Sequence, residues 1–138
     1  MKKIDQNEWN KMLDMAYEAM EHAYVPYSSF QVGACLRTAD GKYYLGCNIE
    51  NAAYSPTNCA ERTAVFKAVY DGIRSFSALA VVCSGNHPAF PCGVCRQVLS
   101  EFCDADMPVV CANKNRETVE TTLEGLLPYS FGRKDLNL

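Results

Sequence analysis

The stretch that decides the fold begins with Ser77-Ala-Leu-Ala-Val-Val-Cys83, continues through Pro91-Cys-Gly-Val-Cys95 and closes with Met107-Pro-Val-Val-Cys-Ala112. The first and last of these segments are short, apolar and rich in Val, which is typical of buried strands. Between them, apolar residues from 92 to 102 follow helical spacing after a polar loop. The order predicts a strand–helix–strand unit within one sheet.

The rest of the chain extends this unit into one domain spanning residues 1–138. Asp5 and Glu8 form a capping-box pattern ahead of a helix that ends before Pro26. Asp40-Gly41 predicts a hairpin turn, and Gly72 a helix stop. A hairpin followed by strand–helix–strand units predicts an α/β fold with three α/β/α layers and a mixed sheet of about five strands. The expected elements are helices at 5–25, 58–70 and 92–102, strands at 30–38, 43–50, 77–83, 107–112 and near 118, and a helical turn at 123–127.

Composition excludes several classes of protein. The 138 residues are 49% hydrophobic and 21% charged, which excludes general disorder. No apolar run approaches the roughly 18–20 residues of a membrane span, and the start of the chain lacks the apolar core of a signal peptide. We therefore expect a cytoplasmic protein with no membrane partner. The net charge is −3, so the chain lacks the excess of basic residues that is typical of nucleic-acid binders.

The eight cysteines divide into two groups. A chain without an export signal is expected to keep its thiols free, so they serve as core side chains or as metal ligands. Cys35, Cys83 and Cys111 lie in apolar, strand-like runs and are expected in the core, and burial is also favoured for Cys47 and Cys103. The remaining thiols are those of Cys59, Cys92 and Cys95.

These three thiols have the spacing of a metal site. Cys92 and Cys95 are three residues apart on a predicted helix, so they face the same way, and 32 residues separate Cys59 from Cys92. All three lie at predicted helix N-termini, where the helix dipole stabilises thiolates. Three thiolates on Zn²⁺ leave the fourth tetrahedral position open, which is typical of catalytic zinc.

Charged neighbours fit the same interpretation. Glu61 lies two positions after Cys59 and need not be a ligand, so it can shuttle protons beside the open position. Arg62 or Arg96 can donate to a thiolate sulfur and offset the negative charge, and Arg62 is favoured. Two alternatives are a redox CxxC motif, which would leave Glu61 unexplained, and a closed structural zinc site with His87 as fourth ligand.

The chain resembles a cytidine deaminase of the small homotetrameric type. The resemblance rests on Cys59-Ala-Glu-Arg-Thr-Ala64 and Pro91-Cys-Gly-Val-Cys-Arg-Gln97, with further matches at 27–34 and 46–55, and it thins after about Cys111. It implies a Zn²⁺ cofactor and hydrolysis of cytidine and 2′-deoxycytidine to uridine and 2′-deoxyuridine with release of ammonia, in pyrimidine salvage. It also implies a homotetramer whose pockets are completed by neighbouring subunits.

The resemblance further implies a role for each matching residue. Three thiols would hold zinc, and Glu61 would move protons during attack of water at C4 of the cytosine ring. The expected zinc ligands are Cys59, Cys92 and Cys95; the expected substrate contacts are Phe30 stacking on the base, Asn48 and Glu50 on the ribose, Ala60 in the pocket, and Ala52, Tyr54 and Phe131 from neighbouring subunits.

Other functions stay open from the sequence alone. An enzyme acting on bases in DNA or RNA is disfavoured by the acidic pI, and Glu50 beside the sugar would repel a 3′-phosphate. A deaminase of a cytosine-nucleoside antibiotic would share the zinc core and differ in its sugar contacts. A non-catalytic, zinc-stabilised binding module would need zinc for stability while Glu61 would be dispensable.

Overall fold

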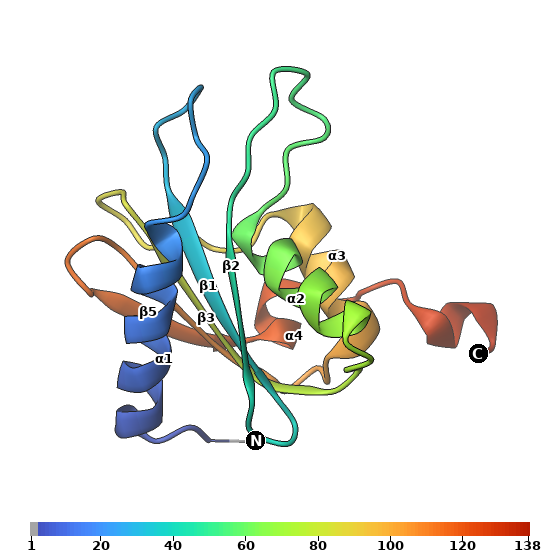
Figure 1. Cartoon of the computed structure of the whole chain (residues 1–138). Coiled ribbons are helices and arrows are strands. Elements are labelled where there is room, and N and C mark those ends of the chain that lie inside the picture. The colour runs from blue at the N-terminus through green and yellow to red at the C-terminus, as the bar shows by residue number, and fades with distance from the viewer. Residues whose placement is uncertain (1–2) are drawn as a thin grey trace.

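A five-stranded mixed sheet forms the centre of the structure, a computed structural model that describes residues 3–138 (Figure 1). Its strands are β1 (Val32–Thr38), β2 (Tyr43–Cys47), β3 (Phe76–Cys83), β4 (Pro108–Ala112) and β5 (Thr118–Thr122). They lie in the order β2-β1-β3-β4-β5. Only the β3–β4 pair is parallel, as a strand–helix–strand unit requires, and the other three pairs are antiparallel.

Helices cover both faces of this sheet, which confirms the predicted three-layer α/β/α fold (Figure 1). The helices are α1 (Gln6–Met20), α2 (Ala60–Tyr70), α3 (Gly93–Phe102), α4 (Leu123–Leu126) and the 3₁₀ turn η1 (Arg133–Leu136). The apolar side of α1 packs on one face, while α2, α3 and α4 contribute to the core on the other. Within residues 3–138, no helix has the length and apolar character that crossing a membrane requires.

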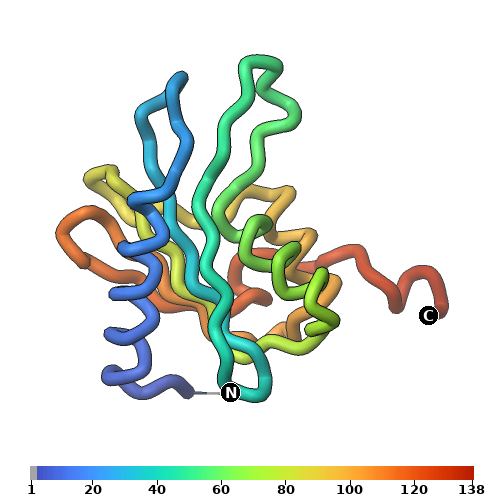
Figure 2. Tube along the Cα trace, viewed as in Figure 1, coloured from blue at the N-terminus to red at the C-terminus, as the bar shows by residue number. Residues whose placement is uncertain are grey.

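Two long loops replace the ends of several predicted elements. α1 ends at Met20 instead of close to Pro26, and the expected strands at 30–38 and 43–50 are shorter. In the second loop, Ile49 exchanges backbone hydrogen bonds with Asn58. Ile49 also forms an isolated β-bridge with Tyr24 of the first loop, outside the sheet. Figure 2 shows both loops, at about 21–31 and 48–59, projecting from the same end of the molecule.

The start of α1 is tied to the β1–β2 hairpin. Asp5 caps the helix by accepting a hydrogen bond from the Glu8 backbone N–H at 2.8 Å. The Glu8 carboxylate, which a full capping box would direct back to Asp5, instead accepts from the Tyr43 hydroxyl at 2.6 Å and pairs with Arg37 at 3.1 Å. The hydrogen bond from Tyr43 lowers the pKa of Glu8.

The core thiols lie where the sequence predicted. Cys35, Cys83 and Cys111 are fully buried in three strands of the sheet, whereas Cys47 and Cys103 are half-buried. All eight cysteines are free. The sheet and its helices also approach closely: a Cβ on Gly33 of β1 would lie 2.0 Å from the Ala16 carbonyl oxygen of α1. Glycine at this position therefore lets a helix backbone rest directly on the sheet.

Candidate metal centre and active site

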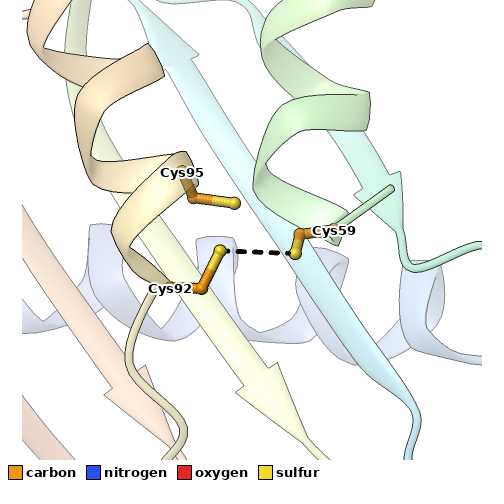
Figure 3. Close-up of side chains that lie close together, drawn as sticks. All are labelled: Cys59, Cys92 and Cys95. Atoms are coloured by element: carbon orange, nitrogen blue, oxygen red, sulfur yellow. Dashed lines mark hydrogen bonds between the residues drawn. The ribbon is translucent and has the colours of Figure 1, made fainter. Parts of the chain in front are cut away.

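Two helix N-termini meet at one end of the sheet and bring three thiols together. Cys59 is the N-cap residue of α2, Cys92 is the N-cap residue of α3, and Cys95 lies in the first turn of α3. Their sulfur atoms lie within 4.8 Å of one another, and 3.7 Å separates Sγ of Cys59 from Sγ of Cys92. Figure 3 shows the three sulfur atoms pointing into the same space from the two helix starts.

This geometry fits a zinc ion. Zn–S bonds of about 2.3 Å in a tetrahedral site place neighbouring sulfurs about 3.8 Å apart, close to the observed 3.7 Å. Among residues 3–138, Cys59, Cys92 and Cys95 are the only group of potential metal ligands that converge in this way. His87 is exposed, and its backbone oxygen accepts a hydrogen bond from Cys83. The structure therefore offers three protein ligands and leaves one tetrahedral position for water or substrate.

The start of α2 is fixed by backbone packing against β2. A Cβ on Gly46 would lie 2.2 Å from the Ala60 carbonyl oxygen, so only glycine allows this approach. The Thr63 hydroxyl donates to the Cys47 carbonyl at 3.0 Å and accepts from the side chain of Asn58 at 3.0 Å. These contacts hold the Cys59 end of the helix in place.

The start of α3 is fixed by Arg96. Its guanidinium donates to the Pro91 carbonyl oxygen and to the Leu126 carbonyl oxygen, each at 2.6 Å. The sequence offered Arg96 as the less favoured thiolate donor, but its guanidinium donates to these two carbonyl oxygens instead. Arg96 therefore connects Pro91, the residue before Cys92, to Leu126 at the end of α4.

Arg62 lies against the thiol cluster. Its Nη2 atom donates to Sγ of Cys59 at 3.2 Å, and its buried Nε has no hydrogen-bond partner within residues 3–138. Hydrogen bonding from Cys95, and then from Arg62, lowers the pKa of the Cys59 thiol. The pKa of Cys95 is raised because it donates to Cys59 and is buried. The site thus favours thiolate at Cys59 even before a metal contributes its charge.

Glu61 is a buried carboxyl at the start of α2. Its side chain is 4% exposed and lines the same cavity as Cys59 and Cys92. Burial raises the pKa of Glu61 to about 7, with a further contribution from the negative charge of Cys59. A carboxyl with this pKa both accepts and releases a proton readily near neutral pH, which is what a general acid–base group requires.

The cavity in front of the thiols has a volume of about 210 Å³. Asn48 lines it, and its amide is held by the Val32 N–H at 2.9 Å and by the Phe30 carbonyl at 2.8 Å. The sequence analysis did not identify Phe90 and Ala89 as lining residues, although their position directly before the Pro91-Cys92 pair was a signal for them. The residues that the structure gathers here are Phe30, Val32, Asn48, Thr57, Asn58, Cys59, Ala60, Glu61, Val81, Ala89, Phe90 and Cys92.

Four expected substrate contacts lie outside this cavity. Glu50 accepts from the Tyr27 N–H at 2.9 Å, from the Ser28 N–H at 3.1 Å and from the Ser28 hydroxyl. Ala52 and Tyr54 are exposed on the second projecting loop, and Tyr54 is 72% exposed. Phe131 is 60% exposed on the C-terminal segment, which Figure 1 shows extending away from the sheet.

The open three-thiol site beside a proton-transfer group is of the class found in zinc hydrolases. Residues 6–111 match the model of the cytidine and deoxycytidylate deaminase zinc-binding region, and the chain belongs to this family. The family has a zinc-binding region, and the three-thiol donor set and the sulfur spacing of this chain are compatible with zinc.

Full-length relatives support the family assignment. A cytidine deaminase of Sporosarcina psychrophila is 57% identical over 127 residues, covering 92% of this chain and 93% of the relative. Another, from Halalkalibacterium halodurans, is 50% identical over 91% of this chain and 96% of the relative. The crystal structure of a cytidine deaminase from Burkholderia pseudomallei superposes with a TM-score of 0.86 at 46% identity, covering 88% of this chain and 98% of that one.

Removing one thiol from the cluster is expected to abolish metal binding. Cys92→Ala should lower bound zinc from about one ion per chain to nearly none, because two thiolates cannot hold the ion in a tetrahedral site. The matched control is Cys35→Ala, which deletes a fully buried thiol of β1 outside the cluster. Zinc content by mass spectrometry and the melting temperature with and without chelator are the readouts. A zinc content of Cys92→Ala equal to that of the parent would show that Cys92 is not a metal ligand.

Proposed function

We propose that the chain catalyses the zinc-dependent hydrolytic deamination of cytidine and 2′-deoxycytidine to uridine and 2′-deoxyuridine, with release of ammonia, in pyrimidine salvage. The observation that carries the proposal is the shared cavity, where the thiol cluster, the buried carboxyl of Glu61 and the Phe30 ring meet. Relatives that share 57% and 50% of their residues with the chain are cytidine deaminases, which supports the same substrate class.

Glu61 performs the proton transfers in this mechanism. Zinc held by the three thiols supplies a Lewis acid that lowers the pKa of water and makes it nucleophilic at neutral pH. The Glu61 carboxylate takes a proton from the attacking water and delivers it to N3 of the cytosine ring. It later takes the second proton, from the hydroxyl group added at C4, and delivers it to the departing ammonia. Its raised pKa allows these transfers in both directions. Arg62, donating to Cys59, reduces the negative charge of the ligand set.

Substrate binding is assigned to Phe30, Asn48, Glu50 and Ala60. The Phe30 ring stacks on the pyrimidine, and Ala60 lines the cavity at the start of α2. Asn48, which lines the cavity, is assigned to the ribose hydroxyls, and its amide also fixes the backbone on either side of residue 31. Glu50 is assigned to the ribose as well, although it lies outside the cavity lining and its carboxylate also accepts hydrogen bonds from Tyr27 and Ser28. A carboxylate beside the sugar repels a phosphate group, so nucleosides are favoured over nucleotides.

We also propose that residues 1–138 act as one domain in the cytoplasm. The two helices whose starts carry the thiols and Glu61 pack on one face of a single sheet, which supports one functional unit. The cysteines of the chain are free, and the three of the thiol cluster must stay reduced to bind zinc. A reducing compartment such as the cytoplasm provides that condition.

The direct test of the function is ammonia release by the zinc-loaded protein. Cytidine, 2′-deoxycytidine, CMP and a cytosine-containing oligonucleotide are compared under the same conditions. We expect release from the two nucleosides only, because Glu50 disfavours the phosphorylated substrates. Release from none of the four by protein that still holds zinc would overturn the proposal and favour an antibiotic deaminase or a binding module.

Glu61→Gln separates catalysis from metal binding. The amide cannot transfer protons, so turnover should fall by about 10²–10⁴-fold, while zinc content and melting temperature stay near those of the parent. The matched control is Glu18→Gln, which changes an exposed carboxylate on α1, across the sheet from the site. A turnover number of Glu61→Gln equal to that of the parent protein would contradict the role of Glu61 in proton transfer.

We further propose a homotetramer whose neighbouring subunits complete each pocket. Ala52, Tyr54 and Phe131 do not line the cavity of their own chain and are exposed, which leaves them available to the pocket of a neighbouring chain. Exposed Phe66 and Tyr70 on α2 supply apolar surface suited to subunit contacts.

Mixing two inactive variants tests this assembly. Glu61→Gln keeps Phe131, and Phe131→Ala keeps Glu61, so random mixed tetramers should restore about a quarter of the pockets. The measurement is activity after co-expression, with light scattering expected to give the mass of four 15.3 kDa chains. A mixture no more active than its separate components, or a monomeric mass, would rule out shared pockets.

A further inference from the structure

We infer that Gly85 is a positioning residue for base binding, because the space left by its missing side chain sets where the Phe30 ring lies. This inference rests on the proposed function, in which Phe30 stacks on the pyrimidine. Gly85 belongs to the loop between β3 and α3, the same loop that leads into Cys92.

The contact between Gly85 and Phe30 leaves no room for a side chain. A Cβ on Gly85 would lie 2.9 Å from Cε1 and 3.7 Å from Cζ of the Phe30 ring. The backbone at Gly85 does not have the positive φ of Gly41 and Gly72, so its conformation does not require glycine. The requirement at this position is therefore space for the ring.

The loop around Gly85 is held on several sides. The Gly85 carbonyl accepts from the Lys114 N–H at 3.1 Å, and the Asn86 carbonyl accepts from the side chain of buried Asn113 at 2.9 Å. A Cβ on Gly85 would also lie 3.7 Å from Sγ of Cys83, which is fully buried. The loop consequently has little freedom to retreat from an added methyl group.

The backbone of Phe30 is held as well. Its N–H donates to the Ser28 hydroxyl at 3.0 Å, and its carbonyl accepts from Asn48 at 2.8 Å. The next residue, Gln31, exchanges two hydrogen bonds with Ser84, each of 3.0 Å. Phe30 as a whole is 39% exposed and lines the cavity. The part of this contact that can move is therefore the ring.

A single loop thus places two parts of the site. Its C-terminal end carries the zinc ligand Cys92, and its N-terminal end supports the aromatic ring on which the base stacks. An added methyl group at Gly85 shifts the ring and leaves the thiol cluster in place, so it weakens substrate binding without altering the chemical step.

The test is Gly85→Ala in the full-length, zinc-loaded protein, with Asn86→Ala as the control from the same loop, where the side chain is exposed. We expect KM for cytidine to rise by up to about tenfold, the scale of an aromatic stacking contact. The turnover number should stay within about twofold and zinc content should be unchanged, because Gly85 touches neither Glu61 nor the ligands. Asn86→Ala should match the parent.

The second part of the test makes the Gly85→Ala substitution in a Phe30→Leu protein, which lacks the aromatic ring. If Gly85 acts through the ring, Gly85→Ala should leave KM unchanged in a Phe30→Leu protein. An equal rise of KM in both backgrounds, a fall in the turnover number or zinc content, or no rise at all overturns the inference. Failure of Gly85→Ala to fold also overturns it, because the overlap would then fall on the backbone. An inactive parent protein would instead refute the proposed function.

Discussion

The structure depends on the convergence of two helix N-termini at one end of the sheet. Three thiols within 4.8 Å concentrate negative charge once they bind a metal, and this charge requires compensation. The N-termini of α2 and α3 and the guanidinium of Arg62 provide it. The helix starts stay in place because Gly46 admits the backbone of Ala60 and Arg96 connects Pro91 to α4.

The start of α2 places a ligand and a proton carrier beside each other. Cys59 faces the metal position as the N-cap residue, and Glu61, two residues later, lies buried against the cavity. Because one rigid helix turn carries both groups, their separation is set by helix geometry instead of by a flexible loop. Burial then moves the pKa of Glu61 to about 7, where proton transfer in both directions is easiest.

The sequence predicted the parts of this protein that depend on local patterns. Apolar periodicity and turn residues predicted the five-strand mixed sheet, and the spacing of Cys59, Cys92 and Cys95 predicted a thiol cluster, which the structure brings together. The loop ends could not be predicted, because the pairing of Ile49 with Asn58 depends on segments that meet only in the folded chain. The connection made by Arg96 was missed for the same reason, since its partner Leu126 lies 30 residues away.

The loop between β3 and α3 also limits how such an enzyme can diversify. Insertions or deletions there would disturb the contact with the Phe30 ring and the approach to Cys92 together. The two projecting loops, in contrast, carry one thiol of the cluster, Cys59, at the end of the second loop. A change in the length of the β3–α3 loop would act on the ring and on the thiol cluster at once, so the span from Ser84 to Pro91 is expected to stay constant in length.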